Sequence, residues 1–98
     1  MAENRVYQQE SAETLAIQAL AWVLAQDDLV AAFLNATGAD TRQMAVLARD
    51  PAFLGGVLDF LMEDDGRVMA FCDSISQPYT APMQARTALP GGQQWHWT

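Results

Sequence analysis

The sequence predicts an all-α protein, a compact bundle of about six helices built from two similar three-helix units. Start and stop signals of helices recur along the chain, no segment shows the alternation of a strand, and a phrase of the first half returns in the second. The 98 residues match the size of one domain, and 51% of them are hydrophobic, which suits a globular core.

Helix signals in the first half predict three helices. Ser11 precedes a long apolar run, with Glu13 in the opening turn, and Gly38 suits the left-handed residue that closes a helix. Asp40 or Thr41 can cap the third helix. The predicted ranges are 12–26, 29–37 and 42–49.

The second half predicts three further helices. Asp50 and Pro51 form a strong start signal, and Thr80 can cap the last helix with Pro82 in its first turn. The predicted ranges are 51–63, 66–75 and 81–89. Gly55-Gly56 inside the first of them disfavours a helix by about 1 kcal/mol per glycine, so we expect another helix to approach there closely.

An internal repeat organises the chain. Residues 22–34 read WVLAQDDLVAAFL and residues 60–72 read FLMEDDGRVMAFC, and each phrase joins a long helix to a short one through an acidic turn. The acids of both turns are expected to cap the following helix, and both phenylalanines, Phe33 and Phe71, to enter the core. The two units are expected to bury their apolar faces against each other with pseudo-twofold or superhelical stacking.

The predicted layout is one domain with two extensions. Residues 1–10 form a flexible N-terminal arm, residues 11–90 a single helical domain with units at about 11–49 and 50–90, and residues 91–98 a C-terminal tail.

The chain resembles a family of small all-helical bacterial proteins, of roughly 90 residues, that is classed as a domain of unknown function. The resemblance rests on ALAWVLAQDDLVAAFLNATG, DPAFLGGVLDFLMEDDGRVMAFC and ALPGG and covers residues from about 13 to 92. It implies a helical cytoplasmic protein and implies no activity.

Charge argues against several classes of partner. The formal net charge is −7, and all five basic residues are arginines scattered along the chain. We therefore expect no binding to nucleic acid, including by a helix-turn-helix at 29–49, and none to anionic membranes. One cysteine, no secretory signal and no apolar run long enough for a membrane span predict a cytoplasmic protein.

The densest acids are Glu63, Asp64 and Asp65, which could bind a hard cation or cap a helix. Capping is favoured because contiguous side chains point in different directions, so no metal site is expected. Cys72 could be a reactive thiol, but it aligns with Leu34 in the repeat, which favours a core position. The usual nucleophiles and bases are nearly absent, so neither a catalytic residue nor a cofactor is expected.

The tail is the main departure from the repeat. Trp95 and Trp97 flank His96, and alternation places both rings on one side of an extended segment, suited to a groove between helices. They either pack on their own domain, which is favoured, or contact a partner.

We expect a non-enzymatic, cytoplasmic domain that binds an unknown protein partner or forms a homodimer. The candidate partner-binding residues are Trp95, His96, Trp97, Glu63 and Asp64. The alternative is a small-molecule binder or minor enzyme with an apolar pocket between the two units. The candidate lining residues of that pocket are Trp22, Phe60, Met62 and Cys72.

Overall fold

The computed structural model describes residues 9–90, which form six α-helices and one 3-10 helix. In chain order these are α1 (Gln9–Leu24), α2 (Asp27–Thr37), η2 (Thr41–Gln43), α3 (Met44–Leu47), α4 (Pro51–Leu61), α5 (Asp65–Ile75) and α6 (Ala81–Thr87). The described part of the chain has no strand, which confirms the all-α prediction.

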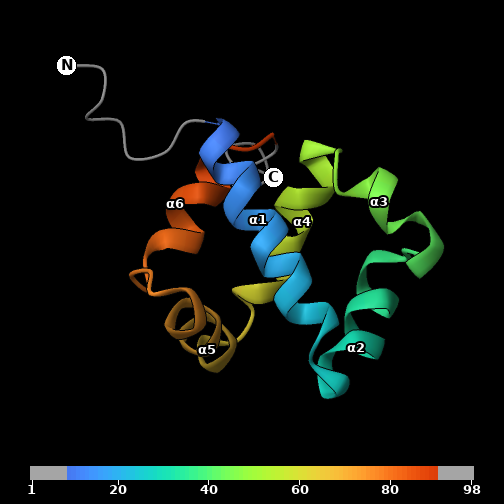
Figure 1. Cartoon of the computed structure of the whole chain (residues 1–98), viewed down its shortest axis with the longest axis horizontal. Helices are drawn as coiled ribbons and strands as arrows, with labels where there is room; N and C mark the ends of the chain where they lie inside the picture. The colour runs from blue at the N-terminus through green and yellow to red at the C-terminus, as the bar shows by residue number, and fades with distance from the viewer. Residues whose placement is uncertain (1–8, 91–98) are drawn as a thin grey trace, which may run out of the picture.

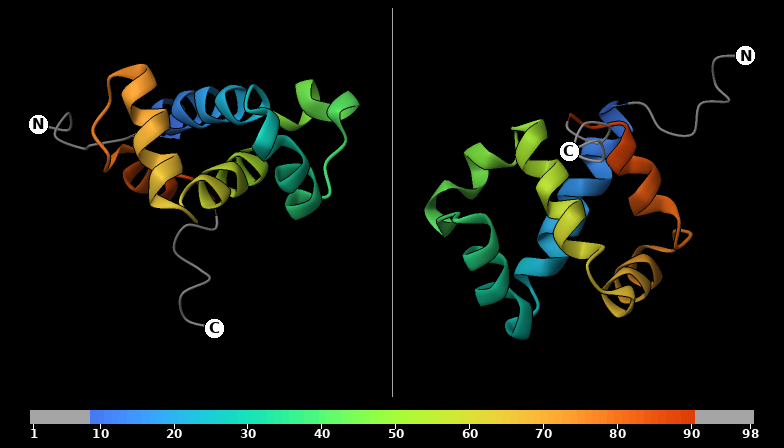
Figure 2. Two further views of the ribbon diagram at one scale, coloured as in Figure 1. Left: turned by 90° about the horizontal axis from the view of Figure 1, so that it is seen from below. Right: turned by 180° about the vertical axis from the view of Figure 1, so that it is seen from behind.

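The two long helices α1 and α4 cross at the centre of the molecule (Figure 1). Helices α5 and α6 lie on one flank of this pair, while α2 and α3 lie on the other. Turned by 90°, α1 and α4 are seen to occupy two layers (Figure 2). The first helix of each unit is therefore central, and the later helices of each unit surround it.

The structure bears out the repeat most closely in the second helix of each unit. Helices α2 and α5 begin 38 positions apart, at Asp27 and Asp65. Both end on a left-handed residue, Gly38 with φ 71° and Ser76 with φ 58°. Phe33 and Phe71 are both completely buried, because each is carried by the same face of its unit into the core. The second helices of the two units thus match in their start, their end and their buried phenylalanine.

The core is made almost wholly of aliphatic and aromatic side chains. No polar or charged residue among the described ones is buried. Phe33 lies at the middle of an aromatic group, with its ring centroid 5.3 Å from that of Phe60 and 6.1 Å from that of Phe53, both edge to face. This geometry favours aromatic pairs and fixes the rings of α4 against α2.

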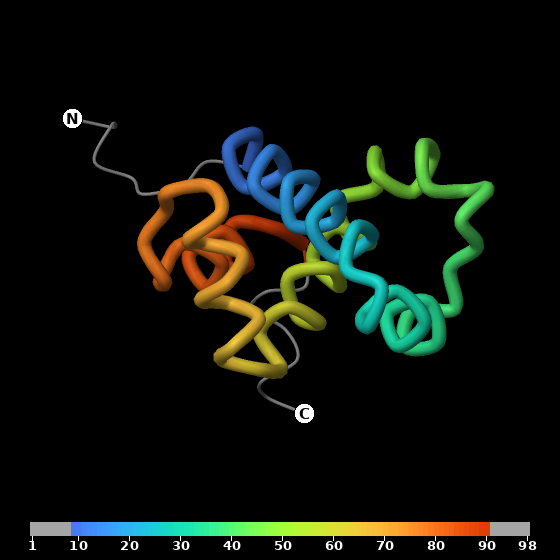
Figure 3. Tube along the Cα trace, turned by 60° about the horizontal axis from the view of Figure 1, so that its bottom comes forward, coloured from blue at the N-terminus to red at the C-terminus, as the bar shows by residue number. Residues whose placement is uncertain are grey.

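The third helices of the two units differ. Helix α6 buries Ala81, Pro82 and Ala85 against both central helices. Its counterpart is the short pair η2 and α3, which has no buried residue and in which Val46 is 72% exposed. Figure 3 shows this segment running along the outer edge of the molecule. The unit that contains α3 is therefore less completely packed than the unit that contains α6.

The predicted helix starts are partly correct. Asp50 caps α4 by accepting from the Ala52 amide at 3.0 Å, and Asp64 caps α5 by accepting from the Arg67 amide at 3.1 Å. Asp40 caps η2 in the same way, through the Arg42 amide at 2.9 Å.

Three other start predictions are wrong. Helix α1 already includes Gln9, so Ser11 lies within it. The cap position of α2 is Gln26, whose side chain makes no capping bond. Asp27 and Asp28 follow it in the first turn, where their negative charges stabilise the helix through its dipole. Thr80 precedes α6 without a side-chain bond.

No single helix within residues 9–90 is long and apolar enough to cross a membrane. Only α1 and α2 taken together reach the required length and composition, and they are bent by 119° at their junction.

Candidate binding groove

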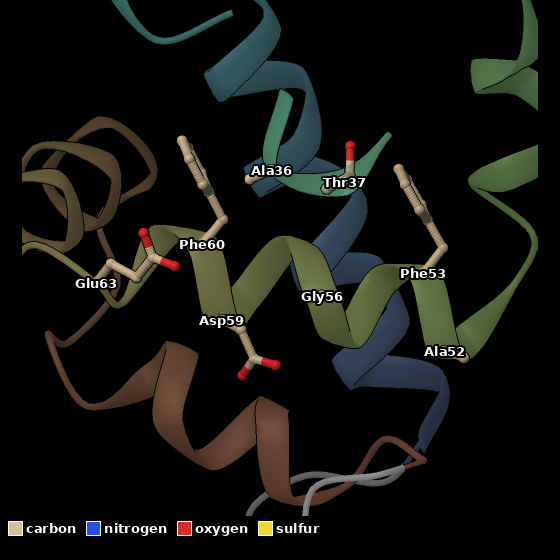
Figure 4. A pocket seen from close by; sticks show the side chains of 8 residues that line it. All are labelled: Ala36, Thr37, Ala52, Phe53, Gly56, Asp59, Phe60 and Glu63. Atoms are coloured by element: carbon tan, nitrogen blue, oxygen red, sulfur yellow. The ribbon is translucent and has the colours of Figure 1, made fainter. Parts of the chain in front are cut away.

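An open groove lies between the end of α2 and the outward face of α4, with a volume of about 360 Å³ (Figure 4). It lies where the last turn of α2 meets α4. The lining residues are Ala36, Thr37, Ala52, Phe53, Gly56, Asp59, Phe60 and Glu63.

Two aromatic rings form the walls of the groove. Phe53 and Phe60 both project from α4 toward the end of α2, and Gly56 lies between them (Figure 4). The seven positions from Phe53 to Phe60 are two helical turns, or about 10 Å along the axis. Because Phe33 packs edge to face with both rings, they are held in place by the core of the domain itself.

Arg67 secures the Phe60 end. Its Nη1 donates to the Phe60 carbonyl oxygen at 2.8 Å, and its Cζ lies 4.3 Å from the centroid of the Phe60 ring. The same Nη1 is 3.8 Å from Glu63, whose side chain is 64% exposed. The Arg67 cation is thus engaged internally, whereas the Glu63 carboxylate remains accessible at the rim.

Arg86 of α6 secures the other side of α4. Its Nε and Nη2 donate to the two carboxylate oxygens of Asp59 at 2.8 and 3.1 Å, and its Nη1 donates to the Pro90 carbonyl at 3.0 Å. Such a two-point contact with a carboxylate is among the stronger and more directional contacts in proteins. Arg86 therefore ties α4 to α6 and to the end of the described chain.

The two adjacent glycines of α4 have different environments. A Cβ at Gly55 would lie 2.7 Å from Nη1 and 2.9 Å from Cζ of Arg86, so the guanidinium needs this glycine. A Cβ at Gly56 would meet nothing within 4 Å. The expected close approach is therefore confirmed at Gly55, where the approaching group is a side chain of α6. At Gly56 the expectation is wrong, because its outward side opens into the groove.

A second groove, of about 300 Å³, occupies the equivalent place in the other unit. It is lined by Ser11, Thr14, Leu15, Gln18 and Gln77. Shifted by the 38-residue repeat, Thr14, Leu15 and Gln18 correspond to Ala52, Phe53 and Gly56 of the first groove. The fold therefore makes the same groove twice, polar on α1 and aromatic on α4.

The predicted site residues are distributed over several places. Phe60 and Glu63 line the α4 groove, and Asp64 caps α5 next to it. Trp22 packs edge-on against Phe71 with ring centroids 6.0 Å apart, and Met62 is half-buried at the end of α4. Neither groove is lined by Trp22, Met62 or Cys72, so a pocket that joins these three with Phe60 stays a prediction.

Cys72 is completely buried, as the repeat predicted. Burial, and secondarily the neighbouring Asp73 carboxylate, raises the pKa of its thiol above the usual value. A raised pKa lowers the thiolate fraction and disfavours reactivity in the folded state.

Sequence reasoning missed most of the groove. Phe53 shares the one-sided apolar spacing of its helix, which indicates a core residue, and Ala36 and Thr37 carry no signal of their own. A usable signal was present at Gly56, which aligns with Gln18 in the repeat and has no packing requirement for glycine. Trp95, His96 and Trp97 lie outside the described residues.

The fold and the groove define the class of this molecule: a small all-α domain of two repeated helical units with one aromatic groove. The chain belongs to the family described as "Protein of unknown function (DUF3572)", whose model matches residues 9–92. No curated protein and no solved structure matches it.

Proposed function

We propose that the protein is a non-enzymatic interaction domain that binds a segment of another protein in the α2–α4 groove. The segment would place an apolar side chain between Phe53 and Phe60 and a basic side chain beside Glu63. The observation that carries this proposal is Gly56, a glycine in the middle of a helix that no contact within the described chain explains.

Glycine in a helix interior lowers stability by about 0.5–1 kcal/mol relative to alanine. At Gly55 the Arg86 guanidinium accounts for that loss of stability. At Gly56 no contact within the described residues offsets the lost stability, but the absence of a side chain opens the floor of the groove. An occupant can then approach the α4 backbone between the two rings.

Charge defines the flanking chemistry of the partner. Glu63 is exposed at one end of the groove, while Asp59 beside it is already held by Arg86. With a net charge of −7, the whole molecule also attracts basic segments over a longer range. An apolar anchor beside a lysine or arginine therefore fits the groove better than an acidic segment does.

The form of the groove supports a protein segment. Its volume of about 360 Å³ is at the lower end of the range for ligand pockets, and it is open along the helix and not enclosed. Anchors of protein interfaces are commonly one or two large side chains in such a site, surrounded by weaker contacts.

The test is a comparison of partner capture by three forms of the full chain: the unchanged protein, Gly56→Leu and Gln18→Leu. A Cβ at position 56 meets nothing within 4 Å, so leucine there would extend into the aromatic groove, and leucine at 18 alters the counterpart groove. A partner recovered from the source cell would then be purified and its affinity for each form measured.

We expect Gly56→Leu to weaken binding by at least about tenfold, the effect of losing one anchor. Gln18→Leu should bind as the unchanged chain does. Equal affinity for all three forms would show that the partner uses another surface and would refute the proposal.

A further inference from the structure

We infer that the α2–α4 groove has a resident ligand, the chain's own C-terminal tail, with Trp95 and Trp97 lying along α4 across Gly56. This inference rests on the groove proposed above as the binding site, and it names a segment of this chain that an external partner would have to displace.

The tail begins close to the groove. The Pro90 carbonyl accepts from Nη1 of Arg86, and that same nitrogen would lie 2.7 Å from a Cβ on Gly55. Gly55 is the chain neighbour of Gly56, which lies at the floor of the groove. Asp59, which Arg86 also holds, lines the groove, so the residues after Pro90 start on the Asp59 side of the groove.

The tail is long enough to extend along the groove. Trp95 is five positions after Pro90, and an extended chain of that length spans about 17 Å. The groove follows α4 from Ala52 to Glu63, which is about 16 Å at the rise of an α-helix. Trp95 can therefore reach any point along the groove from its own chain.

The aromatic side chains of the tail fit the groove chemically. Alternate residues of an extended segment share one side, so Trp95 and Trp97 present their rings together, about 7 Å apart. The groove extends about 16 Å along α4, which leaves room for both rings along its length. Aromatic side chains favour edge-to-face and offset contacts, and the absence of a side chain at Gly56 lets the rings approach the helix.

The short connection to the domain strengthens binding of the tail in the groove. A groove of this size binds a short peptide weakly, but a short connection gives a local concentration in the millimolar range. That concentration favours docking of the chain's own tail over docking of the tail of a second copy. An external segment must compete with it, so the tail sets the affinity of the domain for its partner.

The test uses the full chain in nuclear magnetic resonance, which reports on both sides of the contact. The double variant Trp95→Ala/Trp97→Ala should shift the amide resonances of Phe53, Gly56 and Thr37. The amides of Thr14 and Gln18 in the counterpart groove should keep their positions, which provides a control within the same molecule.

The converse variant is Gly56→Leu. It should move the indole N–H signals of Trp95 and Trp97 to their positions in a synthetic peptide of residues 91–98. The indole signal of Trp22, which packs against Phe71 away from the groove, serves as the reference. Gln18→Leu should leave the tail indoles unchanged.

Three outcomes would overturn the inference. Tail indoles already at the peptide positions in the unchanged chain would show that the tail does not dock. Amide shifts confined to other helices would place the tail elsewhere. Signals that change on tenfold dilution would show that the groove takes the tail of a second copy.

The failure of this inference is distinguishable from the failure of the proposed function. If the tail docks, a chain ending at Gly92 should capture at least about tenfold more partner, since its internal competitor is gone. If no partner exists, the resonance shifts remain. If the tail does not dock, partner capture stays sensitive to Gly56→Leu but not to tail removal.

Discussion

Replacing each of the two adjacent glycines of α4 by alanine should change stability in opposite directions. Both changes are best made in the Trp95→Ala/Trp97→Ala background, so that no tail contact contributes. At Gly56, alanine gains helix propensity and meets nothing within 4 Å. We expect the free energy of unfolding to rise by about 0.5–1 kcal/mol.

At Gly55 the same gain is outweighed by a clash. The new methyl would lie 2.7 Å from Nη1 of Arg86, and the guanidinium cannot move away without losing its bonds to Asp59 and to the Pro90 carbonyl. Hydrogen bonds to charged groups contribute about 1.5–3 kcal/mol each, and less here because the Asp59 side chain is 47% exposed. The expected net result is a loss of about 1–2 kcal/mol.

Urea denaturation followed by circular dichroism measures both free energies, and thermal unfolding provides a second readout. For a domain of this size, 1 kcal/mol corresponds to about 4–8 °C in Tm. The two variants should therefore differ by roughly 10 °C, with Gly56→Ala above the parent and Gly55→Ala below it. If Gly55→Ala proves as stable as Gly56→Ala, the role assigned to Arg86 is wrong.

Three other predictions concern the caps and the core. Asp64→Ala should lower the free energy of unfolding by about 1 kcal/mol, because the bond to the Arg67 amide is lost. Asp65→Ala should lower it by only about 0.3–0.5 kcal/mol, the contribution of this carboxylate to the helix dipole, and chemical denaturation would separate the two variants. Phe33→Leu and Phe71→Leu should each lower stability by about 1–2 kcal/mol, and a large difference between them would argue against equivalent units. Burial raises the pKa of the Cys72 thiol, so it should react with a thiol reagent at least about tenfold more slowly in the native protein than in urea at the same pH. In the native protein the reaction rate should also begin to rise at a higher pH than the rate of a free thiol does.

The sequence predicted the parts of the fold that depend on local signals. Asp50 before Pro51 specified the start of α4, and the repeat predicted the burial of Phe71 from that of Phe33. Ser11 misled because a residue that can cap a helix is also tolerated inside one when good helix formers precede it. Ser76 takes a left-handed conformation without being glycine, which only its alignment with Gly38 could have indicated.

The groove could not be predicted because it depends on which parts of the α4 surface no other helix covers. Phe53 and Phe60 have the spacing of core residues, and they do pack on Phe33. Whether their outer sides are covered depends on how the neighbouring helices pack against α4, which is a tertiary property. Periodicity identifies the apolar face of a helix, but it does not say how much of that face another helix covers.

The divergence of the two equivalent grooves has a consequence for valency. A bundle with two identical halves would offer two identical sites, and partners with two anchors could join such bundles into chains. Here Gln18 stands where the other half has Gly56, and Thr14 where it has Ala52, so only one half keeps an aromatic, open floor. Under the proposed function, the loss of symmetry between the halves predicts that the domain binds one segment per molecule.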